Sequence, residues 1–131
     1  MKNLAFVLSS IFALTAAAAV ARADVSFSDA SQDVTHDCGA DPVVSVSGSS
    51  STITLTGACA KVSIMGSSNK VSVDSSDKVA VTGSTNEIHV VAANKIAVTG
   101  SGNQVTWTRG LKGKKPKIST LGVGNKVRKV K

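Results

Sequence analysis

The chain repeats one short pattern, and this repetition limits its fold more than any other feature of the sequence. A Gly that opens a Gly-Ser-x-Asn motif, or a variant of it, recurs with spacings of 18, 17, 17 and 22 residues. The last interval is longer because the segment LKGKKP, residues 111–116, is inserted in it. A nearly fixed period indicates a chain built from one stacked structural unit. Taken as position zero of each unit, the glycines are Gly48, Gly66, Gly83, Gly100 and Gly122.

Each unit contains two short segments in which apolar and polar residues alternate. Positions −4, −2, +5 and +7 are apolar in most units and rich in Val and Ile, whereas the positions between them are mostly small or polar. In the unit of Gly83 the apolar set is Val79, Val81, Ile88 and Val90. Alternation with a period of two, carried by β-branched residues, predicts two half-buried strands in each unit.

The residues between the two segments are predicted to turn the chain. Gly at position zero and Asn at +3 are the residue types that most readily adopt positive φ, so both columns are expected at corners. Each unit is therefore predicted to be strand, corner, strand, corner. The column at +3 begins with Ser51 and continues with Asn69, Asn86, Asn103 and Asn125.

Two all-β architectures fit this pattern. In a single-domain β-solenoid (β-helix) of five to six coils of about 17–18 residues, each unit is one coil and like residues stack on like. In an antiparallel β-meander or sandwich, each Gly-Ser-x-Asn motif would be a hairpin loop. Only the solenoid requires a near-constant unit length and identical turn residues in register, so it is the predicted fold. A weaker first row, with Asp29 at position zero, would supply the sixth coil.

The first 23 residues do not share the repeat. Lys2 precedes an apolar run and then Ala21-Arg22-Ala23, the pattern of a secretory signal peptide. The alternative is an uncleaved membrane anchor, for which the run is marginal because a span needs about 20 apolar residues. We therefore predict a cleaved signal peptide over residues 1–23, a repeat domain over residues 24–131 without a transmembrane segment, and export to the periplasm or the medium.

Charge is distributed unevenly over the predicted domain. Residues 24–131 keep 13 of the 15 basic residues and all 8 acidic ones, a net charge of +5. Residues 24–41 contain five Asp and no basic residue, whereas residues 109–131 contain nine Lys or Arg and no acidic residue. Five carboxylates are typical of a Ca²⁺ site, but the spacing of these Asp residues matches no EF-hand loop, so a solvated acidic cap is favoured.

Lysines also recur at position −5, where stacking would produce a ladder of like charge. Such a ladder indicates either a stripe for an anionic polymer or a solvated face that discourages edge pairing and aggregation. The basic segment at the end of the chain is typical of a patch for phosphate or sulfate groups. The candidate anion-binding set is Lys61, Lys78, Lys95, Arg109, Lys112, Lys114, Lys115, Lys117, Lys126, Arg128, Lys129 and Lys131.

Two cysteines, Cys38 and Cys59, are present. An even number of cysteines in an exported chain predicts a structural disulfide, with two buried thiols or a redox or metal pair as alternatives. No His lies at the spacing that a zinc site needs. In the solenoid the two cysteines fall in neighbouring rows, about 4.8 Å apart, which suits the Cα separation of a disulfide, about 4.4–6.8 Å.

Several of these motifs occur together in a known family. Asp37-Cys38, the segment LTGAC (residues 55–59), the V-x-V-x-G-S-x-N units and the segment NQVTW (residues 103–107) resemble a family of secreted bacterial proteins. The family is catalogued as domain of unknown function 3060, and the resemblance covers roughly residues 34–127. The basic segment RGLKGKKPK (residues 109–117) departs from it. The resemblance implies the repeat fold and export, and it implies no activity.

The sequence contains no recognisable catalytic constellation. His36 and His89 have no evident partner, and no nucleophile elbow or phosphate loop occurs. The acidic residues inside the repeats lie in columns that do not converge, which disfavours a two-carboxylate glycosidase site. We therefore predict a protein that is not an enzyme and needs no cofactor or metal.

The predicted function is a binding module for anionic polymer, contacting envelope polysaccharide or lipid headgroups through its basic C-terminal end. The alternative is a structural protein that self-associates by stacking end to end. Nucleic acid is a disfavoured partner because of the export signal and the scarcity of aromatic residues on which bases could stack. Phe27 and Trp107 are the two aromatic side chains in residues 24–131, and Trp107 occupies an inward column.

Overall fold

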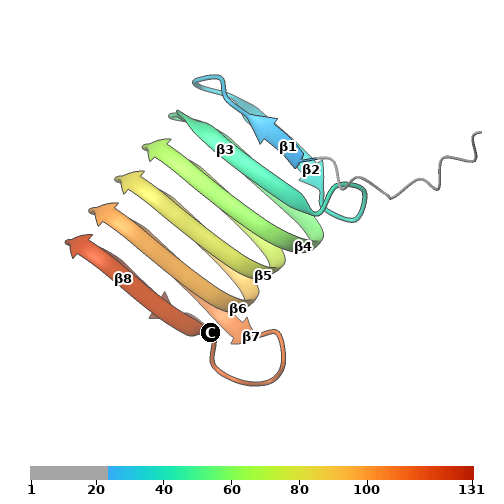
Figure 1. The fold of residues 1–131 in the computed structure, drawn as a ribbon, viewed down its shortest axis with the longest axis vertical. Helices are drawn as coiled ribbons and strands as arrows, with labels where there is room; N and C mark the ends of the chain where they lie inside the picture. The colour runs from blue at the N-terminus through green and yellow to red at the C-terminus, as the bar shows by residue number, and fades with distance from the viewer. Residues whose placement is uncertain (1–23) are drawn as a thin grey trace, which may run out of the picture.

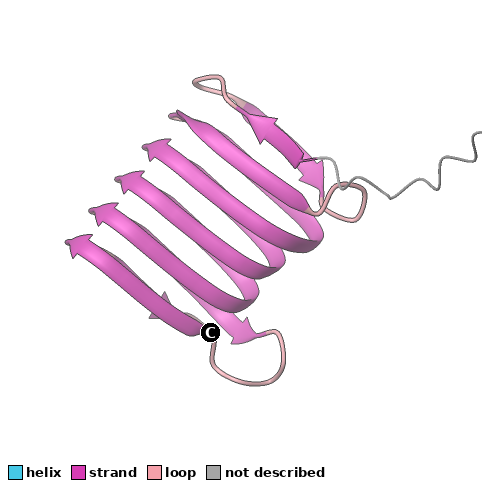
Figure 2. Cartoon of the chain, viewed as in Figure 1, coloured by secondary structure: helices cyan, strands magenta, loops and turns pink. Residues whose placement is uncertain are grey.

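The computed structural model describes residues 24–131, and the signal peptide predicted for residues 1–23 lies outside them. The described chain is all-β, with loops confined mainly to the first corners and to the insertion (Figure 2). None of its residues forms a helix long and apolar enough to cross a membrane. Its strands are β1 (Asp24–Phe27), β2 (Asp33–Asp37), β3 (Val43–Ser49), β4 (Thr52–Ser67), β5 (Lys70–Ser84), β6 (Glu87–Ser101), β7 (Gln104–Gly110), β8 (Lys117–Val123) and β9 (Lys126–Lys129).

The strands form a stack of coils (Figure 1). All pairs of neighbouring strands are parallel, which excludes the antiparallel meander or sandwich and confirms the β-solenoid. On one side the order is β1, β3, the second halves of β4, β5 and β6, and then β8; on the other it is β2, the first halves of β4, β5 and β6, then β7 and β9. The long strands β4 to β6 thus serve both sides.

Equivalent positions of successive units lie side by side, as the repeat predicts. Val62 pairs with Val79, and Val79 with Ile96, so each inward column continues from coil to coil. These side chains are almost completely buried in the inner coils. Burial of each branched side chain stabilises the stack by about 1.5–3 kcal/mol. In the end coils the inward residues are less covered, and Phe27, Val34 and Val127 are only partly buried.

Position zero needs glycine for two reasons. Gly66 has a φ of 123°, a conformation that L side chains rarely adopt. A Cβ on Gly66 would also collide with the carbonyl oxygen of Gly48 in the preceding coil. The same collision recurs at Gly83, where the added Cβ would meet the carbonyl oxygen of Gly66. Glycine therefore sets how closely the coils approach at this corner.

The asparagines at +3 act differently from the prediction of positive φ, which was wrong. Positive φ falls one residue earlier, at Ser50, Ser68 and Thr85, each with a φ of 57°. The Asn side chains instead point inward and bridge neighbouring coils. Asn86 Oδ1 accepts a hydrogen bond from the backbone N–H of Asn69 at 3.1 Å, and Asn86 Nδ2 donates to the Gly66 carbonyl at 3.1 Å.

This amide bridge repeats along the stack. The same pair of bonds is made by Asn69, Asn103 and Asn125 to the coil before each of them. Buried backbone groups at a corner cannot bond to water, so each amide supplies the acceptor and the donor that the corner lacks. The column is a structural ladder of hydrogen bonds.

Two units are longer than the common 17 residues, and both place their extra residues at the same side of the stack. The extra residue of the 18-residue unit lies in a bulge between Leu55 and Ala58. Insertion 111–116 lies between β7 and β8, and after it β8 resumes the register of β6 at Lys95↔Lys117. Insertions at this corner leave both sheets intact.

Candidate functional site

The lysines at position −5 form a ladder along one edge of the stack. Lys61 pairs in register with Lys78, Lys78 with Lys95, and Lys95 with Lys117. All four side chains are exposed. Parallel strands are about 4.8 Å apart, so the four cationic groups follow a straight, closely spaced row. The structure thus brings together residues that are 17 or 22 positions apart in the chain.

The insertion extends this row at the C-terminal end. Lys112, Lys114 and Lys115 are exposed and directly precede Lys117. The loop is folded against the end of β7, where a Cβ on Gly110 would collide with the Lys114 backbone. The insertion is therefore anchored beside the lysine ladder by a close backbone contact.

A hollow of about 570 Å³ opens between the insertion and the last coil. Trp107, Ile118 and Val127 provide apolar walls, and the Lys129 ammonium lies 5.8 Å from the Trp107 ring centroid. Trp107 is 5% exposed, and its Nε1 has no hydrogen-bond partner within residues 24–131. The hollow therefore combines apolar surface with cationic side chains, which are those of Arg109, Lys114, Lys115 and Lys129.

The remaining basic residues do not join the ladder. Arg109 lies near the end of β7, paired with Ala92 of β6. Lys126 and Arg128 lie on β9, in the sheet opposite the one that carries Lys117. Lys131 follows β9 at the end of the chain. The predicted set is thus split between a ladder on one edge and a basic C-terminal end that presents cations on both sheets.

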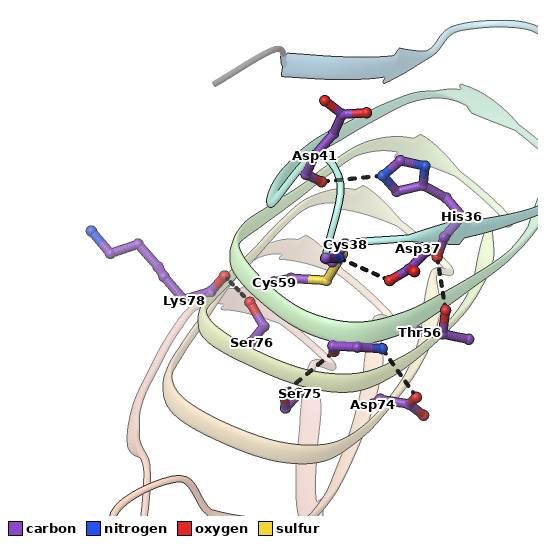
Figure 3. The surroundings of a disulfide bond; sticks show 12 residues. His36, Asp37, Cys38, Asp41, Thr56, Cys59, Asp74, Ser75, Ser76 and Lys78 are labelled. Atoms are coloured by element: carbon purple, nitrogen blue, oxygen red, sulfur yellow. Dashed lines mark hydrogen bonds between the residues drawn. A yellow bond between two sulfur atoms is a disulfide. The ribbon is translucent and has the colours of Figure 1, made fainter. Parts of the chain in front are cut away.

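Cys38 and Cys59 form a disulfide, with a Cα–Cα distance of 4.9 Å (Figure 3). This confirms the predicted bond and excludes free thiols or a metal pair at these positions. The bond links the first coil to the second next to two short polar contacts. The Cys38 N–H donates to the Thr56 carbonyl at 2.8 Å, and Asp37 Oδ1 accepts the Gly39 N–H at 2.8 Å.

The two histidines take part in local contacts. His36 Nε2 lies 3.1 Å from the Asp41 carbonyl oxygen (Figure 3), and its ring meets Phe27 edge-on at 5.9 Å between centroids. His89 Nδ1 lies 2.8 Å from Thr106 Oγ1 on the exposed outer surface. Neither ring contacts a carboxylate in these bonds, so neither forms the base and orienting acid of a hydrolytic triad.

The aspartates of residues 24–41 gather at the opposite end of the stack from the basic residues. Asp24 lies on β1 and Asp33 and Asp37 on β2, all three exposed. Asp29 accepts a hydrogen bond from Gln32 Nε2 at 2.8 Å. Within residues 24–131 no three His, Cys, Asp or Glu side chains are close enough to hold a metal ion. The solenoid therefore has one acidic end and one basic end.

Within the described residues, two buried polar atoms near these ends lack hydrogen-bond partners, and residue type alone does not predict them. The first is the buried Trp107 Nε1, which becomes visible only once the last coil is assembled. The second is Gln32, whose Oε1 is buried without a hydrogen-bond partner in the described part of the chain. Alignment of the weak first row would have pointed to Gln32, because counting from Asp29 places it at +3, in the column of the asparagines.

Comparison with known proteins agrees with the repeat. The family model described as "Protein of unknown function (DUF3060)" matches residues 46–90 and again residues 77–124. Two overlapping matches are expected of a model that spans a few coils of a longer stack. Searches of curated proteins and of solved structures gave no match. With the family matched over more than half of its length, the chain belongs to the DUF3060 family of proteins of unknown function.

Proposed function

We propose that this protein is an exported, non-catalytic module that binds an anionic polymer of the cell envelope through its basic C-terminal end. The observation that carries the proposal is the lysine ladder, which the lysine-rich insertion adjoins at Lys117. The ladder contributes Lys61, Lys78, Lys95 and Lys117 in register, and the insertion contributes three further exposed lysines.

A row of like charges at one spacing suits a ligand that itself repeats. Bringing four ammonium groups to adjacent strands costs electrostatic free energy, which a polyanion lying along the row would offset. A single small anion would neutralise one or two of these groups and leave the others. Repeated acidic groups on a polysaccharide therefore match the ladder better than a monomeric ligand does.

The hollow beside the ladder suits the same ligand class. Its walls pair the Trp107 ring and other apolar groups with Arg109 and Lys129. Sugar rings present apolar faces as well as acidic substituents, which match the apolar and cationic groups of these walls. A terminal acidic sugar is thus the kind of group that the hollow can hold.

Export is part of the proposal and has separate support. The disulfide between Cys38 and Cys59 is of the kind that persists in oxidising compartments such as the periplasm or the medium. Membership of a family of unknown function supplies no activity, and the described side chains offer no acid–base pair. The protein is therefore proposed to bind and not to catalyse.

The test is salt-dependent retention of the purified protein on immobilised polygalacturonate. The triple variant Lys112→Ala, Lys114→Ala, Lys115→Ala is expected to bind at least about tenfold more weakly at 0.1 M salt, because it loses three polymer contacts. Lys78→Ala, in the ladder, is expected to weaken retention more than Lys70→Ala, an exposed lysine outside the ladder.

Three results would overturn the proposal. The first is absence of retention at low salt, and the second is equal loss in Lys78→Ala and Lys70→Ala. The third is preference for vesicles of anionic lipid over the polymer, which would make a membrane surface the ligand.

A further inference from the structure

We propose that copies of this protein stack head to tail in register, with β8 and β9 of one copy against β1 and β2 of the next. Within residues 24–131, each of these four strands pairs along one edge only. An edge strand presents a row of backbone N–H and C=O groups that another strand can complete. The proposal goes beyond polymer binding and does not depend on it. Because Ile118 and Val127 line the hollow and also lie in this contact, a copy that is stacked at its basic end cannot also hold a sugar in the hollow.

The charges of the two ends are opposite in two columns. Asp24 occupies the column of Lys117, because β1 pairs with β3 at Asp24↔Val43 and the register continues through Lys61 to β8. By the same count Asp33 occupies the column of Lys126. One further coil in register therefore places each aspartate beside a lysine, about 4.8 Å away along the stack. Opposite charges in directly facing strand positions are favourable.

The hydrogen-bond ladder at +3 also matches. In each coil the backbone N–H at +3 donates to the side-chain oxygen at +3 of the next coil, from Gln32 with Ser51 to Asn103 with Asn125. Within residues 24–131, Asn125 has no next coil to which its N–H could donate. At the other end, Gln32 Oε1 is buried and has no partner in the described chain. Stacking in register brings the Asn125 N–H next to the Gln32 side chain, whose amide oxygen accepts this hydrogen bond once the side chain turns toward the contact.

The apolar columns continue across the contact as well. Val34 meets Val127 at +5, and both are partly buried in the single copy. Val25 meets Ile118 at −4, where Ile118 is 36% exposed. At position zero the first coil carries Asp29 in place of glycine, and a Cβ at this position of the inner coils would collide with the preceding coil's carbonyl oxygen. This corner is therefore more open in the contact than inside the stack, and the close contact is made by the strands. At +7, His36 of one copy lies next to Lys129 of the other, and this pair adds no electrostatic attraction.

A contact between the two different ends of one molecule can repeat without limit. Such a heterologous contact generates an open filament unless its rotation closes a ring. Each added copy uses the acidic end of one molecule and the basic end of another, so every copy makes the same interface. Assembly is therefore expected to grow with protein concentration and to weaken with salt.

The first test is charge reversal, without polymer present. The whole chain is expressed in a bacterial host, its N-terminus is determined by intact mass, and self-association is measured by sedimentation velocity. The variant Lys117→Asp, Lys126→Asp carries acid at both ends, and Asp24→Lys, Asp33→Lys carries base at both. Each alone is expected to associate at least about tenfold more weakly than the wild type. Their mixture is expected to recover association, because every contact then joins unlike charges.

The second test reports the register directly. Ser26 and Ser119 both lie at −3, are exposed in the single copy, and face each other across the proposed contact. The variant Ser26→Cys, Ser119→Cys is expected to form a ladder of disulfide-linked oligomers under mild oxidation. In the control Ser26→Cys, Leu121→Cys the partners are offset by two residues, beyond disulfide reach, and little cross-linking is expected.

Any of three outcomes overturns the proposal. The first is a wild-type protein that stays monomeric at every concentration and salt. The second is association that both charge-reversed variants retain. The third is equal cross-linking of the two cysteine pairs, which would exclude the in-register arrangement.

Discussion

The inner coils and the two end coils of this solenoid differ in burial, hydrogen bonding and strand pairing. Between Thr52 and Gly110 the inward side chains are buried, each Asn amide bonds to its neighbours, and every edge is paired. In the first and last coils the same columns carry partly buried residues, charged groups and incomplete hydrogen bonds. The inner coils account for the fold. The ends carry the features that do not repeat, and both the hollow of the proposed binding surface and the proposed stacking contact lie at the ends.

The largest expected loss of stability comes from a substitution at a corner of the inner coils. Gly83→Ala should lower the free energy of unfolding by about 4 kcal/mol, because its Cβ meets the Gly66 carbonyl at a φ of 134°. Gly113→Ala is the matched control, since it also has positive φ but nothing lies within 4 Å of its added Cβ. Urea unfolding measures both, and equal losses would show that φ, and not coil contact, makes glycine necessary.

The second effect concerns the acidic end. Replacing Cys38 and Cys59 by Ser should cost about 3 kcal/mol, because the disulfide closes a loop with a sequence separation of 21. The loss should be local, since each coil contacts only its neighbours. Hydrogen exchange is expected to accelerate in β1 and β2 and to stay unchanged in β6. Uniform acceleration would mean that the ends and the inner coils unfold as one unit.

The smallest effect compares two rungs of the amide ladder. Asn86→Ala should cost about 2 kcal/mol, because it leaves the buried Asn69 N–H and the Gly66 carbonyl without their partners. Asn125→Ala should cost about 1 kcal/mol, since Asn125 is only partly buried and water can replace its bonds. Thermal or urea unfolding gives the difference. A greater loss at Asn125 would contradict the assignment of the last coil as the weaker one.

Much of the fold follows from the repeat alone. The apolar columns, the row of Asp29, the lysine ladder and the pairing of Cys38 with Cys59 were all predicted by counting from the glycines. Counting succeeds because a solenoid converts a fixed sequence interval into a fixed place in the coil. The role of the asparagines was not predicted, since residue type suggests a turn conformation and says nothing of a bond to the next coil.

The sequence by itself determined the unit, its period, the inward columns and the opposite charges of the two ends. Only the tertiary structure decided how the basic residues divide between the two sheets, where the hollow opens, and which polar groups are left incomplete. The reason is physical. Periodicity describes contacts that recur, whereas the first and last coils are defined by the neighbours that they lack. Their surfaces exist only once the stack has formed.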